Sequence, residues 1–228
     1  MRFVPFPRSE TGCLSYLIAD DAAGAGLIVD PPQDPTPLLQ EAQRFALPVT
    51  LVAETHTHAD HVSGAYRLAE RLHAPLLLPS LSRATFPHRR YGEGSTLRVG
   101  DVGLRATHTP GHTPDSMSLI LEDRALVGDA LLVGTVGRAD FYPEGPVELY
   151  HSIFDKLLRL HDKIEIHPAH FGPRHGLPDR MVTTIGDERR TNEALTQKSK
   201  ADFVRYMTEG WPPKPHGWEE IVARNLRG

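Results

Sequence analysis

The feature that most constrains this chain is a dense group of metal-binding side chains between His56 and His61. The group has the pattern His-x-His-x-Asp-His and follows an apolar segment, Val49–Ala53, that predicts a buried strand. In an extended loop, His56 and His58 point the same way and can chelate one cation. The side chains of Asp60 and His61 then face a position adjacent to that cation. Imidazole and carboxylate ligands suit zinc, iron or manganese, so the motif predicts a metal site at the end of a strand.

The composition of the chain limits which classes of binding partner we expect. Its 228 residues include 25 Lys and Arg against 29 Asp and Glu, a formal net charge of −4. This balance argues against nucleic acid as a partner and against a nuclease, because contacts with phosphates need clustered basic residues. No apolar run approaches the roughly 18 residues that span a bilayer, no secretory signal is visible, and the single cysteine cannot form an internal disulfide. We therefore expect a cytoplasmic protein with no membrane partner.

Apolar periodicity predicts strands interspersed with helices, in two halves of similar rhythm. The expected strands are 14–19, 26–30, 49–53, 76–78, 97–99, 104–106, 117–121, 125–127 and 163–166. The expected helices are 35–45, 65–72, 147–160 and a short one at the C-terminus. This alternation predicts an α/β protein in which two sheets pack together with helices outside. We expect one domain over 1–228, with 171–228 as a helical and loop-rich extension.

Three further candidate ligands lie downstream, each where an expected strand meets a loop. His112 follows a Pro-Gly pair, whose tight turn exposes the imidazole. Asp129 follows the strand 125–127, where its carboxylate can bind or bridge a metal. His170 follows the last strand, in the segment His-Pro-Ala-His. Each residue alone is more often a turn residue or a partly buried polar group, but together with the first motif the three indicate one metal centre.

This order of ligands, from His56 through His112 and Asp129 to His170, resembles the metallo-β-lactamase superfamily. The resemblance covers nearly the whole chain. It implies an αββα sandwich of two mixed sheets with helices outside and with metal at the open edge between the sheets. It leaves the reaction open, because the superfamily includes lactamases, thioester hydrolases, nucleases and oxygenases.

Two segments resemble a narrower group, the persulfide dioxygenases. They are Gly-Arg-Ala-Asp-Phe at 137–141 and Thr-Ile-Gly-Asp-Glu-Arg-Arg-Thr-Asn at 184–192. The tail through Asn225 resembles the metallo-β-lactamase domain of bacterial persulfide dioxygenases with a fused rhodanese, and we expect a stand-alone dioxygenase domain here. The resemblance implies that O₂ oxidises a low-molecular-weight thiol persulfide, such as glutathione persulfide, to sulfite and the free thiol. A homodimer is a further expectation from this resemblance.

The same resemblance implies one Fe(II) per chain, bound by His56, His112 and Asp129. Three protein ligands leave three positions open for substrate and O₂, as in a facial triad of two histidines and one carboxylate. The remaining metal-binding side chains would orient these ligands and tune the iron; they are His58, Asp60, His61 and His170.

The substrate carrier is expected to meet two arginines, Arg138 and Arg189. Their guanidinium groups suit carboxylates of a thiol carrier, and the alternative for each is an ion pair within the protein, such as Arg138 with Asp140. Segment 171–176 lacks the cysteine that rhodanese-fused relatives carry after the last histidine, so the identity of the carrier stays open. Cys13 begins an apolar strand and is expected to be a small buried residue.

The main alternative is a thioester hydrolase resembling glyoxalase II, with two Zn(II) per chain. One zinc would bind His56, His58 and His112, the other Asp60, His61 and His170, and Asp129 would bridge them. A hydroxide shared by the two ions would attack the thioester carbonyl. The segments 137–141 and 184–192 favour the dioxygenase. A third possibility is a non-catalytic relative without metal, but such a chain should show gaps in the ligand set, and this one shows none.

Overall fold

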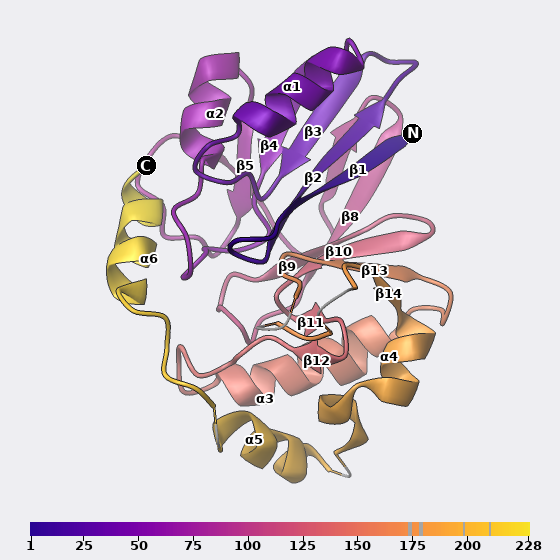
Figure 1. The fold of residues 1–228 in the computed structure, drawn as a ribbon, viewed down its shortest axis with the longest axis vertical. Helices are drawn as coiled ribbons and strands as arrows, with labels where there is room; N and C mark the ends of the chain where they lie inside the picture. Colours follow the sequence, from indigo (N-terminus) through magenta and orange to yellow (C-terminus); the bar gives the residue numbers. More distant parts are fainter. Residues whose placement is uncertain (173–174, 178–179, 198, 210) are drawn as a thin grey trace.

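Two six-stranded sheets form the centre of the computed structural model (Figure 1). The structure describes residues 1–172, 175–177, 180–197, 199–209 and 211–228. The first sheet has the order β1-β2-β3-β4-β5-β6. Its strands are β1 (Arg2–Arg8), β2 (Cys13–Asp20), β3 (Ala25–Val29), β4 (Val49–Ala53), β5 (Leu76–Pro79) and β6 (Arg89–Tyr91). The sheet is mixed, because β1 to β3 pair antiparallel and β3 to β6 pair parallel.

The second sheet has the order β14-β13-β10-β9-β8-β7. Its strands are β7 (Thr96–Val99), β8 (Val102–His108), β9 (Met117–Ile120), β10 (Arg124–Gly128), β13 (Glu165–Pro168) and β14 (Thr183–Thr184). Only the pairing of β10 with β13 is parallel among the described strands of this sheet. A small hairpin of β11 (Leu131–Leu132) and β12 (Thr135–Val136) stands beside it. Every strand expected from the sequence is present, with ends that agree within two residues.

The facing sides of the two sheets share one apolar core. Leu14 and Ile18 of β2 point into it and pack in the same cluster as Leu104 and Leu119 of the second sheet. Leu17, on the opposite face of β2, belongs to a cluster beneath the helices. Side chains alternate along a strand, and every residue of β2 is buried because both faces are covered.

Helices cover the outer face of each sheet (Figure 1). The first sheet carries α1 (Thr36–Arg44) and α2 (Ala65–Leu72). The second carries α3 (Gly145–Tyr150), α4 (Ile185–Thr191) and α5 (Lys200–Thr208). A π-helical turn (His151–Lys156) and a 3-10 turn (Leu157–Arg159) continue α3. Another 3-10 turn (Glu193–Thr196) precedes α5. Leu38 of α1 and Leu68 of α2 are buried against Val52 of β4. This order of layers confirms the predicted αββα sandwich.

The C-terminal part of the chain contributes to the outer core of the second sheet. Ile185, Phe203 and Met207 are fully buried, in the same cluster as Leu149 of α3 and Ile166 of β13. The last helix, α6 (Trp218–Arg227), lies apart from α5 and runs along the side of the molecule (Figure 1). The shared core supports a single domain over 1–228, which stays a prediction. Within the part of the chain that the structure describes, none of the helices combines the length and apolarity needed to cross a membrane.

Strand β1 was not expected from the sequence. Pro5 and Pro7 argue against a strand, because proline has no N–H for the sheet ladder. The strand lies at the edge of the first sheet and pairs only with β2 among the described strands. An edge strand needs donors on one side only, so the two prolines are accommodated there.

Candidate metal centre

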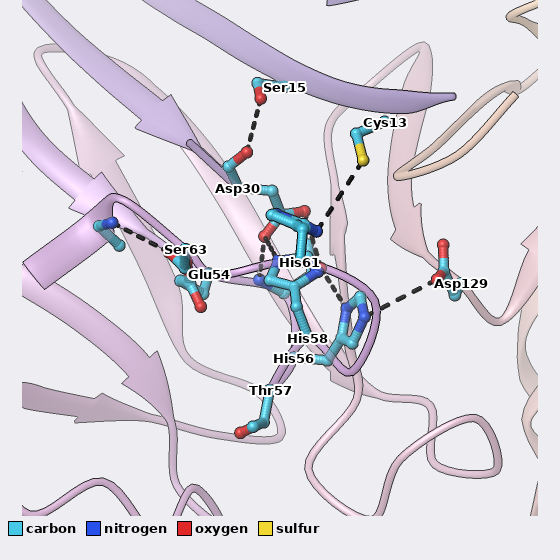
Figure 2. A network of polar contacts seen from close by, with 12 residues as sticks. Cys13, Ser15, Asp30, Glu54, His56, Thr57, His58, His61, Ser63 and Asp129 are labelled. Carbon is cyan, nitrogen blue, oxygen red and sulfur yellow. Dashed lines mark hydrogen bonds and ion pairs between the residues drawn. The ribbon is translucent and has the colours of Figure 1, made fainter. Parts of the chain in front are cut away.

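Loops at the ends of strands bring the predicted metal-binding residues to one edge of the sandwich. The motif from His56 to His61 lies between β4 and α2, His112 lies between β8 and β9, Asp129 follows β10, and His170 follows β13. Figure 2 shows the imidazoles of the motif gathered in one place, with the strands leading up to them. The parallel strands β10 and β13 end at the same edge of their sheet, which explains why Asp129 and His170 lie together.

His56, His112 and Asp129 form a first group of donor atoms. One ligand atom from each lies within 4.8 Å of the others, and all three residues are buried. Asp129 Oδ2 lies 3.4 Å from His112 Nε2 and 3.8 Å from His56 Nε2. His56 Nε2 is buried without a hydrogen-bond partner. Leaving such an atom unsatisfied costs about 1–3 kcal/mol, and a metal ion would use its lone pair. The group therefore fits a metal ion.

Hydrogen bonds on the far side of each ring orient the two histidines of the first group. Thr55 Oγ1 donates to Asp30 Oδ2 at 2.8 Å and can therefore accept a hydrogen bond from His56 Nδ1, 2.9 Å away. His112 Nδ1 lies 2.8 Å from the carbonyl oxygen of Arg138, which can only accept. Both rings thus carry their proton on Nδ1 and present a bare Nε2 to Asp129, as metal-binding histidines do.

Protonation states in the first group also suit a metal ion. Burial alone would raise the pKa of Asp129, but the imidazoles of His170, His112 and His56 outweigh it and hold the pKa of the carboxyl well below its usual value. Burial and the neighbouring His58 lower the pKa of the His56 imidazole well below its usual value. A carboxylate and a neutral imidazole are the forms that bind metal.

His58 lies beside the first group, with its ring centroid 4.2 Å from that of His56. Its Nε2 lies 3.4 Å from Asp30 Oδ1, and both ring nitrogens are buried without a hydrogen bond. Burial and His61 lower the pKa of His58, but Asp30 and Glu54 outweigh them and raise it. Burial in turn raises the pKa of Glu54 to about 7. In the described part of the chain, neither of the two groups of clustered donor atoms includes His58.

A second group contains Asp60, His61 and His170, together with Cys13. His170 Nε2 lies 2.8 Å from Asp60 Oδ2, and His61 Nδ1 lies 3.1 Å from Asp60 Oδ1. On the other side of its ring, His170 Nδ1 lies 2.8 Å from Asp129 Oδ1. The imidazole of His170 therefore stands between the two groups and contacts both.

Cys13 is the member of this group that sequence reasoning missed. It is buried, as expected, but its Sγ lies 3.6 Å from both Asp60 Oδ2 and His170 Nε2 and 3.9 Å from His61 Nδ1. Burial raises the pKa of the thiol, but His170 and His61 outweigh burial and lower it to about 6. No local motif could reveal this placement, because 47 residues separate Cys13 from Asp60 and 157 separate it from His170.

A cavity of about 290 Å³ opens beside both groups. His112 and Asp129 of the first group line it, as do Asp60 and His170 of the second. Much of the remaining wall is apolar and comes from distant segments, among them Leu132, Val136, Phe141 and Trp211. An apolar cavity with a few convergent polar groups is the usual form of a small-molecule site.

Arg138 lines this cavity, but its guanidinium group is engaged within the protein. It donates to both oxygens of Asp140, at 2.7 and 2.9 Å. It also donates to the carbonyl oxygens of Pro212 at 2.9 Å and Pro213 at 3.1 Å. The internal ion pair that the sequence allowed as an alternative is thus present, and it ties the C-terminal segment to the cavity wall.

The structure places Arg189 elsewhere. Its guanidinium group donates to Asp162 Oδ1 at 2.9 Å and to the carbonyl oxygen of Leu158. It is not among the described residues that line the cavity. Within segment 171–176, where the sequence lacks the cysteine expected of a rhodanese-fused dioxygenase, Pro173 and Arg174 lie outside the described residues.

Comparison with known proteins assigns the family. Residues 8–170 match the metallo-beta-lactamase superfamily. The chain belongs to this superfamily. The mitochondrial persulfide dioxygenase ETHE1 of Mus musculus is 32% identical over 230 residues, which cover 97% of this chain and 85% of the relative. The crystal structure of ETHE1 from Myxococcus xanthus has a TM-score of 0.92 at 33% identity and covers 99% of this chain and 98% of that chain.

The chain is also similar to a hydrolase. The hydroxyacylglutathione hydrolase GloC of Haemophilus influenzae is 31% identical over 224 residues, which cover 87% of this chain and 99% of the relative. The comparisons confirm the predicted superfamily and the resemblance to persulfide dioxygenases. The superfamily and the clustered His and Asp donors together indicate a metal-binding enzyme.

Proposed function

We propose that this chain is an iron-dependent persulfide dioxygenase. It oxidises a low-molecular-weight thiol persulfide, glutathione persulfide or an analogue, with O₂. One persulfide, one O₂ and one water give one free thiol, one sulfite and two protons, so all atoms balance. A homodimer, expected from the resemblance to persulfide dioxygenases, is part of the proposal.

The observation that carries this proposal is that the first group of clustered donor atoms consists of His56, His112 and Asp129 and does not include His58, whose ring lies beside that of His56 with centroids 4.2 Å apart. A dinuclear hydrolytic site needs His58 as a third nitrogen ligand beside His56 and His112, but His58 lies against Asp30 instead. The remaining set of two Nε2 atoms and one carboxylate is that of a facial triad, which leaves positions open. Iron(II) held by His56, His112 and Asp129 would supply the redox chemistry for the reaction of O₂ with the persulfide.

The protein residues around this set orient the ligands and limit access of water. His170 holds the carboxylate of Asp129 through its Nδ1, 2.8 Å from Oδ1. The ring of Phe141 packs edge-on against His112, with centroids 5.3 Å apart, and forms part of the apolar wall. An apolar wall excludes bulk water, which protects a reactive sulfur species from side reactions.

The proposal is tested by metal content and oxygen consumption. Protein produced with iron supplied and zinc limited should contain about one iron per chain and consume O₂ with glutathione persulfide, releasing sulfite. Asp129→Ala and His112→Ala should lose both the iron and the oxygen uptake. His161→Ala, at an exposed histidine away from the site, should keep both. Full activity of either ligand variant would contradict the assignment.

A dinuclear zinc thioester hydrolase is the second candidate. The similarity to GloC and the presence of all seven potential ligands favour it. His170→Ala separates the two, because it should abolish a dizinc hydrolase and only weaken a monoiron oxygenase. About two zinc ions per chain that persist in excess iron, with hydrolysis of S-lactoylglutathione, would replace the first proposal by the second.

A further inference from the structure

Two buried polar residues of segment 184–192 have no part in the proposed reaction so far. Glu188 is 1% exposed and Asn192 is 0% exposed. Like Arg189, neither is among the described residues that line the cavity beside the metal centre. Their polar groups contact the hairpin of β11 and β12 instead, and this hairpin does line the cavity.

The hairpin forms part of the wall of that cavity. Its lining residues are Leu132 of β11, Thr135 and Val136 of β12, and Gly137 directly after β12. Metal-binding residues of both groups line the same cavity. The position of the hairpin therefore sets how much space is open to a substrate beside the metal centre.

The hairpin has little support of its own. Its two strands have two residues each and pair only with one another among the described strands. An isolated hairpin of two strands is marginally stable at best. In its loop, Gly134 has a φ of +78°, whereas Val133 is not among the described residues with a positive φ. The turn is thus neither of the primed types, whose twist matches antiparallel strands, and the hairpin needs contacts from outside to keep its shape.

Glu188 and Asn192 supply such contacts at the loop. The amide of Gly134 donates to Glu188 Oε1 at 3.1 Å and to Oε2 at 3.0 Å. Asn192 Nδ2 donates to the carbonyl oxygen of Thr135 at 2.8 Å and to Glu188 Oε2 at 2.6 Å. Hydrogen bonds in a buried network of this kind strengthen one another. The side chain of Asn192 therefore holds both the strand after the turn and the carboxyl group that holds the turn itself.

We propose that Glu188 and Asn192 are positioning residues for the substrate. Acting through the hairpin, they set how tightly the cavity binds the thiol persulfide, although neither side chain touches it. This inference rests on the proposed function, because the substrate is the one named there. It also gives segment 184–192 a part in substrate binding that does not depend on Arg189.

The metal ligands have supports that do not involve this network. His170 Nδ1 holds the carboxylate of Asp129, and a backbone carbonyl oxygen faces Nδ1 of His112. A loosened hairpin should therefore weaken substrate binding and leave iron binding and the chemical step unchanged. Loss of binding energy that the substrate and the transition state share raises KM at constant kcat.

Asn192→Ser tests the proposal. Asn192 Oδ1 accepts from the amide of Ala194 at 3.0 Å and so caps the 3-10 turn that follows; serine keeps an oxygen for this cap but removes both Nδ2 donors. In full-length, iron-loaded protein we expect faster amide exchange over residues 131–136. KM for glutathione persulfide should rise about fivefold or more, with kcat and iron affinity unchanged. Asn192→Asp, which has nearly the same shape and also lacks the donors, should give the same result if the serine variant does not fold.

Thr191→Ala is the matched control. Thr191 is the neighbouring residue, but it is exposed and its hydroxyl bonds to the carbonyl oxygen of Asp187 within its own helix. Amide exchange of the hairpin and KM should stay at the wild-type values in this variant. Unchanged exchange over residues 131–136 in Asn192→Ser would overturn the proposal. Faster exchange with unchanged KM would overturn it too, as would a fall in kcat or in iron affinity.

Failure of the proposed function would give a different result. If the wild-type protein takes up no O₂ with glutathione persulfide, that function is contradicted whatever the variants do. KM and kcat are then measured with S-lactoylglutathione, because the hydrolase alternative uses the same cavity. A higher KM for this thioester in Asn192→Ser would support the role of the hairpin, and an unchanged KM would overturn it.

Discussion

The two histidines of the first group differ in what sets their tautomers. His112 Nδ1 faces the backbone carbonyl of Arg138, which no side-chain substitution removes. His56 Nδ1 faces the hydroxyl of Thr55, which Asp30 orients by accepting its proton. Because a wrong tautomer would place a proton on the nitrogen that must bind metal, His56 is the ligand that depends on a neighbouring side chain.

Replacing Thr55 by valine tests this dependence. Thr55→Val keeps the shape of the side chain and removes the acceptor for His56 Nδ1, so iron affinity should fall about 10- to 100-fold in titrations against a chelator. Thr109→Val is the control, because Thr109 is buried and its hydroxyl bonds to Ser118 instead. Wild-type iron affinity in Thr55→Val would show that the tautomer is set in another way.

Among the elements, α6 has an unusual part in the site. Asn225 of this helix donates to the carbonyl oxygens of His58 and His61, both at 2.9 Å, and its Oδ1 accepts from the amide of Ser63 at 2.9 Å. No residue of α6 is fully buried. Through the side chain of Asn225, the helix spans the loop that carries the metal motif.

Asn225→Ala should release this loop. The loss of three hydrogen bonds, each worth about 0.5–1.5 kcal/mol, should lower the free energy of unfolding by about 2 kcal/mol in urea denaturation. Amide exchange over residues 57–63 should also become faster. Arg227→Ala, on an exposed side chain of the same helix, should change neither quantity. If amide exchange in this loop is unchanged in Asn225→Ala, other contacts must hold the loop in place.

At the scale of the whole molecule, the free energy of unfolding should depend on pH through one buried carboxyl group, that of Glu188, at a distance from the metal site. Glu188 of α4 is 1% exposed and accepts hydrogen bonds from the Gly134 amide and from Asn192 Nδ2. Burial raises the pKa of Glu188 more than these hydrogen bonds lower it. The folded state therefore holds the proton more tightly than the unfolded state, whose pKa is near 4.5.

The sign of the pH effect follows from this difference. The stabilisation from protonated Glu188 is fully present below the unfolded pKa and is lost as pH rises through the folded pKa. Glu188→Gln should flatten the corresponding fall in the free energy of unfolding, measured by urea denaturation between about pH 4 and pH 8. Glu193→Gln, at an exposed position nearby, should leave it unchanged. If the free energy of unfolding falls with pH as steeply in Glu188→Gln as in the wild type, this carboxyl is not a source of the pH dependence.

Elements with strong local periodicity were predictable in detail. The strand Val49–Ala53 and the helix Ala65–Leu72 begin and end where the sequence indicates. The predicted helix 147–160 is present only in part as α-helix, because it changes to a π-helical turn at His151. Strand β1 was missed because its two prolines oppose a strand wherever it is not at an edge. Edge position is a property of the sheet, which the local pattern does not contain.

The sequence by itself determined the superfamily, the layers and the set of metal-binding side chains, because the spacing within one short motif and the positions of strand ends are local properties. Only the tertiary structure decided how the set divides. It turned His58 toward Asp30, placed His170 between the two groups and brought Cys13 to Asp60. Ligand sets depend on distances of a few ångströms between atoms far apart along the chain, and those distances exist only after the two sheets have packed together.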